Sequence, residues 1–214
     1  MKRVLSFIFL SVFIFSLNAQ EVKTIQLNEH SKVRGTSVME AFQNRQTIRE
    51  YDATPLSLQD LSDVLWAANG INRPNGKKTA PSAMNSQDVD IYVSQADGAY
   101  LYDAATNSLK QVTDQDIRAL FGRSAGTSVY LLLISDMAKY KGYSAENTEQ
   151  NKNLYEMGCL DAGIVSQNIA VCCAGLGLGT WPRVGMDQKG LRTALKLKDS
   201  QIIWLNQPVG YPKK

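Results

Sequence analysis

The chain has 214 residues, of which 44% are hydrophobic and 20% are charged, and its formal net charge is +3. This length suits a single domain with a hydrophobic core of its own. The charge is too close to neutral to give an electrostatic reason for binding nucleic acid or an anionic membrane surface.

The first 19 residues have the pattern of a signal peptide. Lys2 and Arg3 precede an apolar run over residues 4–17, and Ala19 is a small residue suited to a cleavage point. The run is too short for a convincing transmembrane anchor. We therefore expect an exported protein, periplasmic or extracellular, with no stable membrane insertion after signal cleavage. The remainder divides into a polar lead-in over residues 20–35 and one domain over residues 36–214.

Helices and strands interleave along the rest of the chain. Capping residues and apolar periodicity predict helices over residues 36–44, 57–70, 113–122, 154–175 and 187–195. Apolar or alternating runs between turn residues predict strands over residues 89–93, 100–102, 109–112, 128–134 and 202–209. A long loop over residues 71–85 and a polar connection over residues 136–152 complete the pattern. This order predicts an α+β layered fold, because regular strand–helix units with a phosphate loop are missing.

The most apolar part of the mature chain is residues 154–182, which carry only two charges, Glu156 and Asp161. A helix with so little charged surface has to be buried, so we expect it at the centre of the core. The polar run at residues 166–168 argues against a membrane span. The glycines that follow fit either a helix end with a tight turn or a close approach of backbone to a ligand.

The chain offers few catalytic side chains. His30, the only histidine, falls in the polar lead-in, where we expect an exposed residue without a catalytic role. Cys159, Cys172 and Cys173 lie on one predicted helix and do not resemble a disulfide framework, so we interpret them as small core residues. We expect no metal site, since the sequence has no Cys-x-x-Cys pair and no carboxylate cluster with ligand spacing. Such a chain either binds without chemistry or relies on a cofactor.

Residues 45–49 (RQTIR) place two arginines and a hydroxyl close together. In extended backbone Arg45, Thr47 and Arg49 share a side, and in a helix the two arginines are neighbours. Either geometry suits a phosphate group. The alternative is a solvated basic face of the protein.

Four separated segments, in this order, resemble the FMN-dependent nitroreductase superfamily, and especially its branch of azoline-forming peptide dehydrogenases. They are RQTIR at 45–49, APSAMNSQ at 80–87, the helix-to-glycine passage at 161–180, and WPRVGMD at 181–187 with PVGYP at 208–212. The resemblance covers nearly all of the chain after residue 37. It implies a mostly antiparallel sheet flanked by helices, with a long central helix at the interface of a homodimer that holds two FMN sites.

The resemblance also implies which residues bind FMN. Arg45, Thr47 and Arg49 would hold the phosphate, with Gln46 contributing mainly backbone. Pro81, Ser82 and Asn85 would line the isoalloxazine ring, usually from the partner subunit. Pro182, Val184 and Gly185 would lie along the ring, with the Gly185 amide directed at the nitrogen that takes the hydride. The cofactor would carry the chemistry, so no catalytic side chain is expected.

We therefore predict an exported, homodimeric FMN oxidoreductase that works by alternating half-reactions. It would transfer hydride or electrons between FMN and small-molecule donors and acceptors of nitro, quinone or azoline type. The pocket for the acceptor would include Trp181, Arg183, Arg73 and residues 140–143. The alternatives are a non-catalytic module that binds or sequesters flavin and an exported structural protein without a cofactor. Because NAD(P)H is scarce outside the cytoplasm, we expect a different physiological donor.

Overall fold

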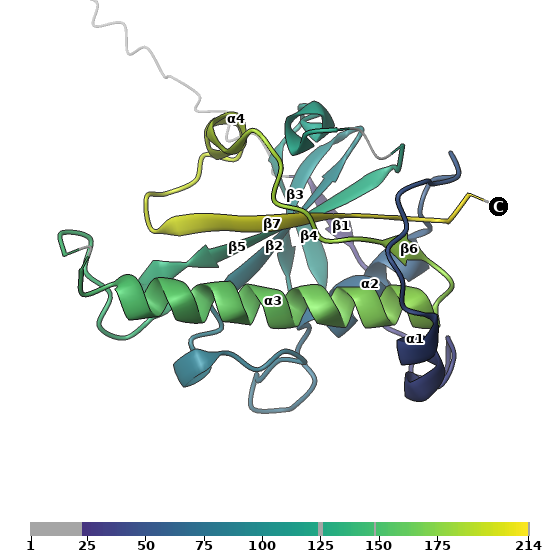
Figure 1. Cartoon of the computed structure of the whole chain (residues 1–214), viewed down its shortest axis with the longest axis horizontal. Helices are drawn as coiled ribbons and strands as arrows, with labels where there is room; N and C mark the ends of the chain where they lie inside the picture. The colour runs from purple at the N-terminus through teal and green to yellow at the C-terminus, as the bar shows by residue number, and fades with distance from the viewer. Residues whose placement is uncertain (1–22, 124–125, 148, 214) are drawn as a thin grey trace, which may run out of the picture.

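A computed structural model describes residues 23–123, 126–147 and 149–213. The predicted signal peptide lies outside the described residues. The fold is α+β, as the sequence predicts, with one sheet between two layers of helices (Figure 1).

The sheet has seven strands in the order β1-β4-β3-β2-β5-β7-β6, and every neighbouring pair is antiparallel. The strands are β1 (Thr24–Gln26), β2 (Val89–Gln95), β3 (Gly98–Asp103), β4 (Ser108–Thr113), β5 (Val129–Asp136), β6 (Gly179–Thr180) and β7 (Gln201–Gly210). The predicted strands are all present. The hairpin of β3 and β4 follows from the turn at residues 104–107 between two apolar runs.

Helices cover both faces of the sheet (Figure 1). The α-helices are α1 (Val38–Asn44), α2 (Leu58–Asn69), α3 (Lys152–Gly175) and α4 (Gln188–Ala194), and the short 3₁₀ helices are η1 (Ala83–Asn85), η2 (Arg118–Phe121) and η3 (Met137–Lys139). The α1, α2 and α3 helices lie on one side, and α4 with η2 lies on the other. Strand β5 is buried on both faces. Its side chains alternate between the two cores, with Val129, Leu131 and Leu133 toward α2 and α3 and Tyr130, Leu132 and Ile134 toward α4.

The α3 helix runs the length of the sheet, about 36 Å for its 24 residues. Its buried side chains include Val165, Ile169 and Cys173, which pack in the main core. Among the described residues, α3 is the one helix long and apolar enough to cross a membrane, and 44% of its most apolar window is buried inside the protein. This is the central core helix that the sequence predicts.

Local capping patterns account for two other helices. Ser57 accepts a hydrogen bond from the Asp60 amide at the start of α2, and Gly70 ends that helix, as predicted. Asp187 accepts from the Gly190 amide at the start of α4. Both side chains satisfy amides that a helix start leaves unpaired.

Three segments differ from the sequence prediction. The helix predicted over residues 113–122 is shorter, because Thr113 pairs with β3 and η2 begins only at Arg118. Within the predicted lead-in, β1 pairs with β4 and the neighbouring Leu27 is buried, so the sheet begins before residue 36. The polar connection contains two anchors, Met137 and Tyr140, which are buried in a small cluster with Leu154 of α3.

Candidate functional site

Residues 45–49, the predicted phosphate-binding segment, lie beside β6 and the end of α3. Arg45 leaves α1 in extended backbone, and the Ile48 amide donates to the Thr180 carbonyl oxygen at 3.3 Å. A Cβ built on Gly179 would lie 2.6 Å from Ile48 Cγ2. Gly179 therefore allows Ile48 to approach the backbone closely. The sequence pattern allowed either a tight turn or contact with a ligand for the glycines of this segment.

The side chains of Arg45, Thr47 and Arg49 are exposed. Arg49 lies over Trp181, with its Cζ 5.0 Å from the ring centroid. Within residues 23–123, 126–147 and 149–213, neither Arg45 nor Arg49 forms an ion pair. Two unpaired guanidinium groups thus stand at one corner of the protein, next to the segment that follows β6.

That second segment, residues 181–185, alternates between inward and outward side chains. Arg183 points inward, where its Nε donates to Asn206 Oδ1 at 2.6 Å and its Nη1 donates to the Arg123 carbonyl oxygen at 2.6 Å. Pro182 and Val184 are exposed, and Val184 keeps 72% of its surface. Pro182 and Val184 therefore form an apolar, exposed edge, and Arg183 holds this segment against the sheet through its hydrogen bond to Asn206 of β7.

The Gly185 backbone is fixed by its neighbours. A Cβ built on Gly122 would lie only 2.6 Å from the Gly185 carbonyl oxygen, so a larger residue at position 122 would displace this turn. In the described part of the chain the Gly185 amide has no hydrogen-bond acceptor. A free amide at an exposed edge suits the predicted contact with a flavin nitrogen.

A cleft of about 200 Å³ lies beside residues 44–48. Its walls come from that segment, the last turns of α3, β6 and the residues after β7, and it is lined by Asn44, Gln46, Ile48, Ala170, Ala174, Gly177, Leu178, Thr180 and Pro212. Of the predicted flavin contacts, Gln46 lines this cleft, whereas Arg45, Thr47 and Arg49 do not.

Pro81, Ser82 and Asn85 lie elsewhere in the protomer, in and just before η1. The loop is fastened to the first half of α3, since the Ala83 amide donates to both carboxylate oxygens of Asp161, at 3.1 and 2.8 Å. The cleft, by contrast, is lined by Ala174 of the same helix. Thirteen residues of helix separate the two points by about 20 Å. One protomer therefore does not bring these residues to Arg45 and Arg49.

The predicted acceptor pocket is only partly assembled. Tyr140 is buried, and its hydroxyl donates to Asp161 Oδ2 at 2.8 Å. Arg73 donates a hydrogen bond from Nη2 to the Lys78 carbonyl oxygen at 2.8 Å. Trp181 remains beside the candidate site, and its Nε1 is buried with no acceptor among the described residues.

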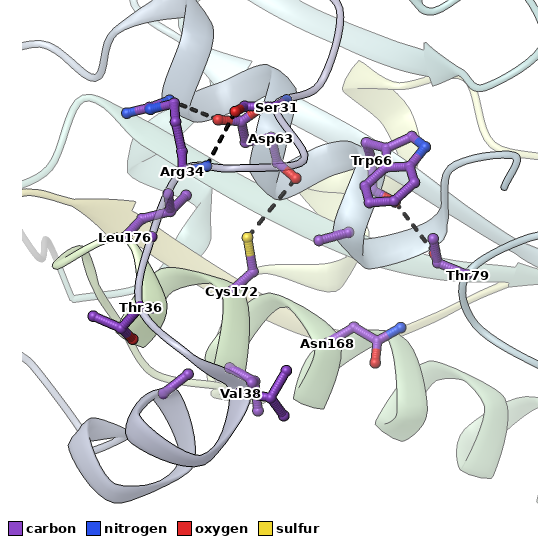
Figure 2. A pocket seen from close by; sticks show the side chains of 15 residues that line it. Ser31, Arg34, Thr36, Val38, Asp63, Trp66, Thr79, Asn168, Cys172 and Leu176 are labelled. Carbon is purple, nitrogen blue, oxygen red and sulfur yellow. Dashed lines mark hydrogen bonds and ion pairs between the residues drawn. The ribbon is translucent and has the colours of Figure 1, made fainter.

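A separate cavity of about 420 Å³ lies between the lead-in, α1, α2 and α3 (Figure 2). Arg34 closes one side by pairing with Asp60 and Asp63 of α2, and Cys172 of α3 donates to the Asp63 carbonyl oxygen. The predicted FMN contacts are absent from its lining. Nearby, His30 is half-buried and stacks on Trp66 with ring centroids 3.7 Å apart, so the expectation of an exposed histidine is wrong.

The cysteines divide into two environments. Burial raises the pKa of the Cys172 thiol to about 12 and holds the pKa of Cys173 well above its usual value, as expected for core residues. Cys159 is exposed on α3, so the prediction of a core position is wrong for it. In the described ranges no group of three histidine, cysteine or acidic residues could hold a metal ion.

The sequence pattern of the nitroreductase family matches residues 42–211. The chain belongs to this family. Its membership confirms the superfamily that the sequence resembles and explains why the arginine segment, the helix-to-glycine passage and the segment after β6 occur together. It also confirms the predicted class of enzyme, an FMN-dependent oxidoreductase.

Individual relatives agree with this assignment. A protein of Methanocaldococcus jannaschii that is named as a nitroreductase is 29% identical over 177 residues, which span 78% of this chain and 86% of the relative. A crystal structure of a nitroreductase-like protein from Ralstonia eutropha JMP134 superposes with a TM-score of 0.79 at 28% identity, over 89% of this chain and 90% of that one. A nitroreductase-like protein from Desulfovibrio desulfuricans, solved in complex with FMN, shares the fold with a TM-score of 0.58 at 21% identity, over 84% and 88% of the two chains.

Proposed function

We propose that this nitroreductase-family protein is a homodimeric FMN oxidoreductase that moves hydride or electrons between a small organic donor and a small organic acceptor. The observation that carries the proposal is the placement of Arg49, which forms no ion pair with the residues that the structure describes, against Trp181 and beside the exposed edge at residues 182–185. A phosphate held by the arginines would leave a planar ring system within reach of that edge.

The residues present fit FMN. Arg45 and Arg49 offer planar, charged donors that match phosphate oxygens, and Thr47 adds a hydroxyl. The free Gly185 amide would donate to the edge of the ring, and a backbone donor at that point favours the electron-rich reduced form. Pro182 and Val184 would exclude water from one side of the ring. FMN itself supplies reversible acceptance of a hydride, which explains why the chain needs no histidine or cysteine for chemistry.

The exposed side of α3 supports a homodimer. Leu160 and Ile164 keep 69% and 37% of their surface in the protomer, and they share this side with Gly163, Gln167 and Val171. A Cβ built on Gly163 would meet nothing within 4 Å. An apolar helix side with a glycine at its centre suits close packing against the same helix of a second copy.

Twofold packing of α3 would also complete the flavin site. The exposed side runs from Leu160 to Val171. An antiparallel second copy packed at the middle of this stretch would bring its Asp161 to the same level along the helix axis as Ala170 of the first. Asp161 holds η1, and Ala170 lines the cleft beside the arginine segment. Pro81, Ser82 and Asn85 of one copy would then face the phosphate-binding residues of the other. In such a shared site the η1 loop and the arginine segment of one chain serve different flavins, which agrees with their separation of about 20 Å along α3.

We further propose that the protein is exported and uses a donor other than NAD(P)H. The support is the signal-peptide pattern of residues 1–19 together with the scarcity of nicotinamide cofactors outside the cytoplasm. Oxidation of an azoline precursor or reduction of a nitro compound or quinone would both fit an open ring edge without acid–base side chains.

The visible spectrum of the mature protein, with mass analysis of any flavin released on heating, tests the cofactor. Anaerobic reduction of the bound flavin by a small organic donor, with an azoline precursor among those tried, followed by reoxidation with a quinone or a nitroaromatic, tests turnover and the donor and acceptor classes. A colourless protein that takes up no FMN would contradict the proposal. Bound flavin that no donor reduces would instead indicate a flavin-binding module, and efficient turnover with NADH or NADPH at low micromolar concentration would contradict the proposed donor.

A further inference from the structure

The loop that carries Pro81, Ser82 and Asn85 has a strained backbone. Met84, Asn85 and Gln87 adopt positive φ angles of 53°, 53° and 49°. Asparagine tolerates this left-handed region, whereas Met84 and Gln87 do so at a cost. Such residues persist where surrounding contacts over-determine the chain, and they cluster at functional sites. The contacts that hold this loop therefore bear on the site it serves.

Asp161 is the main anchor of the loop. Its carboxylate is buried, and both of its oxygens share the single N–H of Ala83, while Oδ2 also accepts from the Tyr140 hydroxyl. Inside the loop, Ser82 Oγ accepts from the Gln87 amide at 2.9 Å. Gln87 holds the other end of this segment, since its Nε2 donates to the Gly76 carbonyl oxygen and its own carbonyl oxygen accepts from Lys139 Nζ.

A second buried carboxyl group, that of Asp88, lies at the end of the same loop within hydrogen-bonding reach of Asp161. Asp88 is fully buried, and its Oδ1 accepts from Ser86 Oγ at 3.1 Å. Its Oδ2 forms no hydrogen bond among the described residues, because the nearby Ser135 hydroxyl donates to the Gly158 carbonyl oxygen instead. Burial first, and then the nearby Asp161 carboxylate, raise the pKa of Asp88 to about 6, against the lowering effect of Ser135 and Ser86. A proton on Asp88 Oδ2 would remove the repulsion between the two carboxylates and would let this oxygen donate a hydrogen bond to Asp161.

The other titratable groups nearby form no ion pair with Asp88 or Asp161 among the described residues. Tyr140, on the segment after η3, keeps its proton because burial and Asp161 raise its pKa. Lys139 of η3 binds Asp90 of β2 at 2.6 Å and otherwise points to backbone oxygens of Gln87 and Asp88. Lys78, from the loop before η1, is half-buried, and the loss of hydration there is the main cause of its lowered pKa. Neither lysine contacts a carboxylate oxygen of Asp88 or Asp161 among the described residues.

We propose that a proton on Asp88 bonds to the Asp161 carboxylate and that this proton locks the 81–87 loop in its strained form, which makes Asp161 a positioning residue for the flavin. The proposal rests on the proposed function, in which this loop lines the ring. Loss of the proton leaves two buried negative charges in contact, which loosens the link between the loop and α3. FMN is then held more firmly in mildly acidic solution than in alkaline solution.

The matched variants are Asp88→Asn and Asp97→Asn. An asparagine at position 88 keeps a donor toward Asp161 at every pH, whereas Asp97 pairs with Lys23 at the far end of β2 and serves as the control. The dissociation constant of FMN is measured by fluorescence for the mature dimer at about pH 5 and about pH 8. Since the FMN phosphate itself titrates near pH 6, the variants are compared with the wild type at each pH.

We expect Asp88→Asn to bind FMN like the wild type at the lower pH and up to about tenfold more tightly at the higher pH, because one pKa unit of linkage is tenfold in affinity. Asp97→Asn should follow the wild type at both. The inference would be overturned if the ratio of the FMN dissociation constants of Asp88→Asn and the wild type were the same at both pH values.

Hydrogen exchange of the amides at residues 82–87, measured without flavin, separates this inference from the proposed function. The loop should be equally protected in the wild type and Asp88→Asn at the lower pH, and less protected in the wild type at the higher pH. If the protein bound no FMN, the proposed function would fail and the exchange result would still decide the role of the pair. Equal protection of the two proteins at both pH values would overturn it.

Discussion

The Arg49 guanidinium lies 5.0 Å from the centre of the Trp181 ring, although 132 positions separate the two residues along the chain. The contact joins the segment that follows α1 to the segment that follows β6. It thereby places the charged and the apolar halves of the proposed flavin site at one corner of the protomer.

Arg49→Ala should weaken FMN binding by about 10-fold to 100-fold, because hydrogen bonds to charged groups contribute about 1.5–3 kcal/mol. The FMN affinity of Arg49→Lys should lie between those of the wild type and Arg49→Ala, since lysine keeps the charge and loses the planar pair of donors. Flavin titration monitored by fluorescence measures the effect. The control is Lys110→Ala, which removes an ion pair with Asp103 on β4 and β3, toward the edge of the sheet opposite β6. Equal affinity in Arg49→Ala and the control would contradict the phosphate role.

Gly163→Leu should split the proposed dimer into folded monomers that lose their flavin. The side chain meets open space in the protomer, so only packing against a second copy is disturbed. Gly163→Ala is the matched control, and it should stabilise α3 by up to about 1 kcal/mol. Sedimentation and circular dichroism together distinguish dissociation from unfolding. A Gly163→Leu protein that sediments as the wild type does would count against the α3 interface.

Two apolar residues of α3 should respond differently to truncation. Ile169 is fully buried, so Ile169→Ala should lower the free energy of unfolding by about 2–5 kcal/mol at any protein concentration. Leu160 is exposed in the protomer, so the loss caused by Leu160→Ala should grow with protein concentration, as expected when the side chain acts through association. Chemical denaturation at several concentrations provides the comparison. A concentration-independent loss in Leu160→Ala would argue against its burial between two copies.

The stability of the protein should depend on pH through Asp88. The folded pKa of about 6 lies above the unfolded value of about 3.9, so the folded state binds the proton more tightly. The contribution of Asp88 is therefore complete below about pH 4 and is lost as the pH rises through about 6, by at most about 1.4 kcal/mol per pH unit.

Denaturation of Asp88→Asn and the wild type across this range isolates the effect. The lowered pKa values of Asp97 and Asp103 act in the opposite direction at lower pH and are the same in both proteins. The difference in unfolding free energy should change by a few kcal/mol across the window. A difference that stays constant would show that Asp88 titrates alike in the folded and unfolded chains.

Much of the fold could be predicted because local rules decide it. The caps at Ser57 and Asp187 and the apolar strand at 128–134 depend only on near neighbours in the sequence. The helix expected from Thr113 failed because its capping pattern competes with the pairing of Thr113 with Ala99 of β3. A ladder hydrogen bond to a distant strand is invisible in a local pattern.

The candidate site was predictable only in part. The resemblance selected residues 45–49 and 181–185, and the structure places them side by side. The meeting of Asp88 with Asp161 could not be predicted, since it joins a loop to a helix 73 positions away. One signal was present, because Asp161 is one of only two charges in residues 154–182 and a buried helix tolerates such a charge only with partners.

The spacing of the two half-sites along α3 has a genetic consequence. If each chain lends its arginines to one flavin and its η1 loop to the other, a chain altered at Arg49 and a chain altered in the loop carry complementary defects. Co-expressed, they would assemble mixed pairs in which one site collects both defects and the other collects none. Such pairs would recover half of the flavin content of the wild type, although neither altered chain binds flavin well alone.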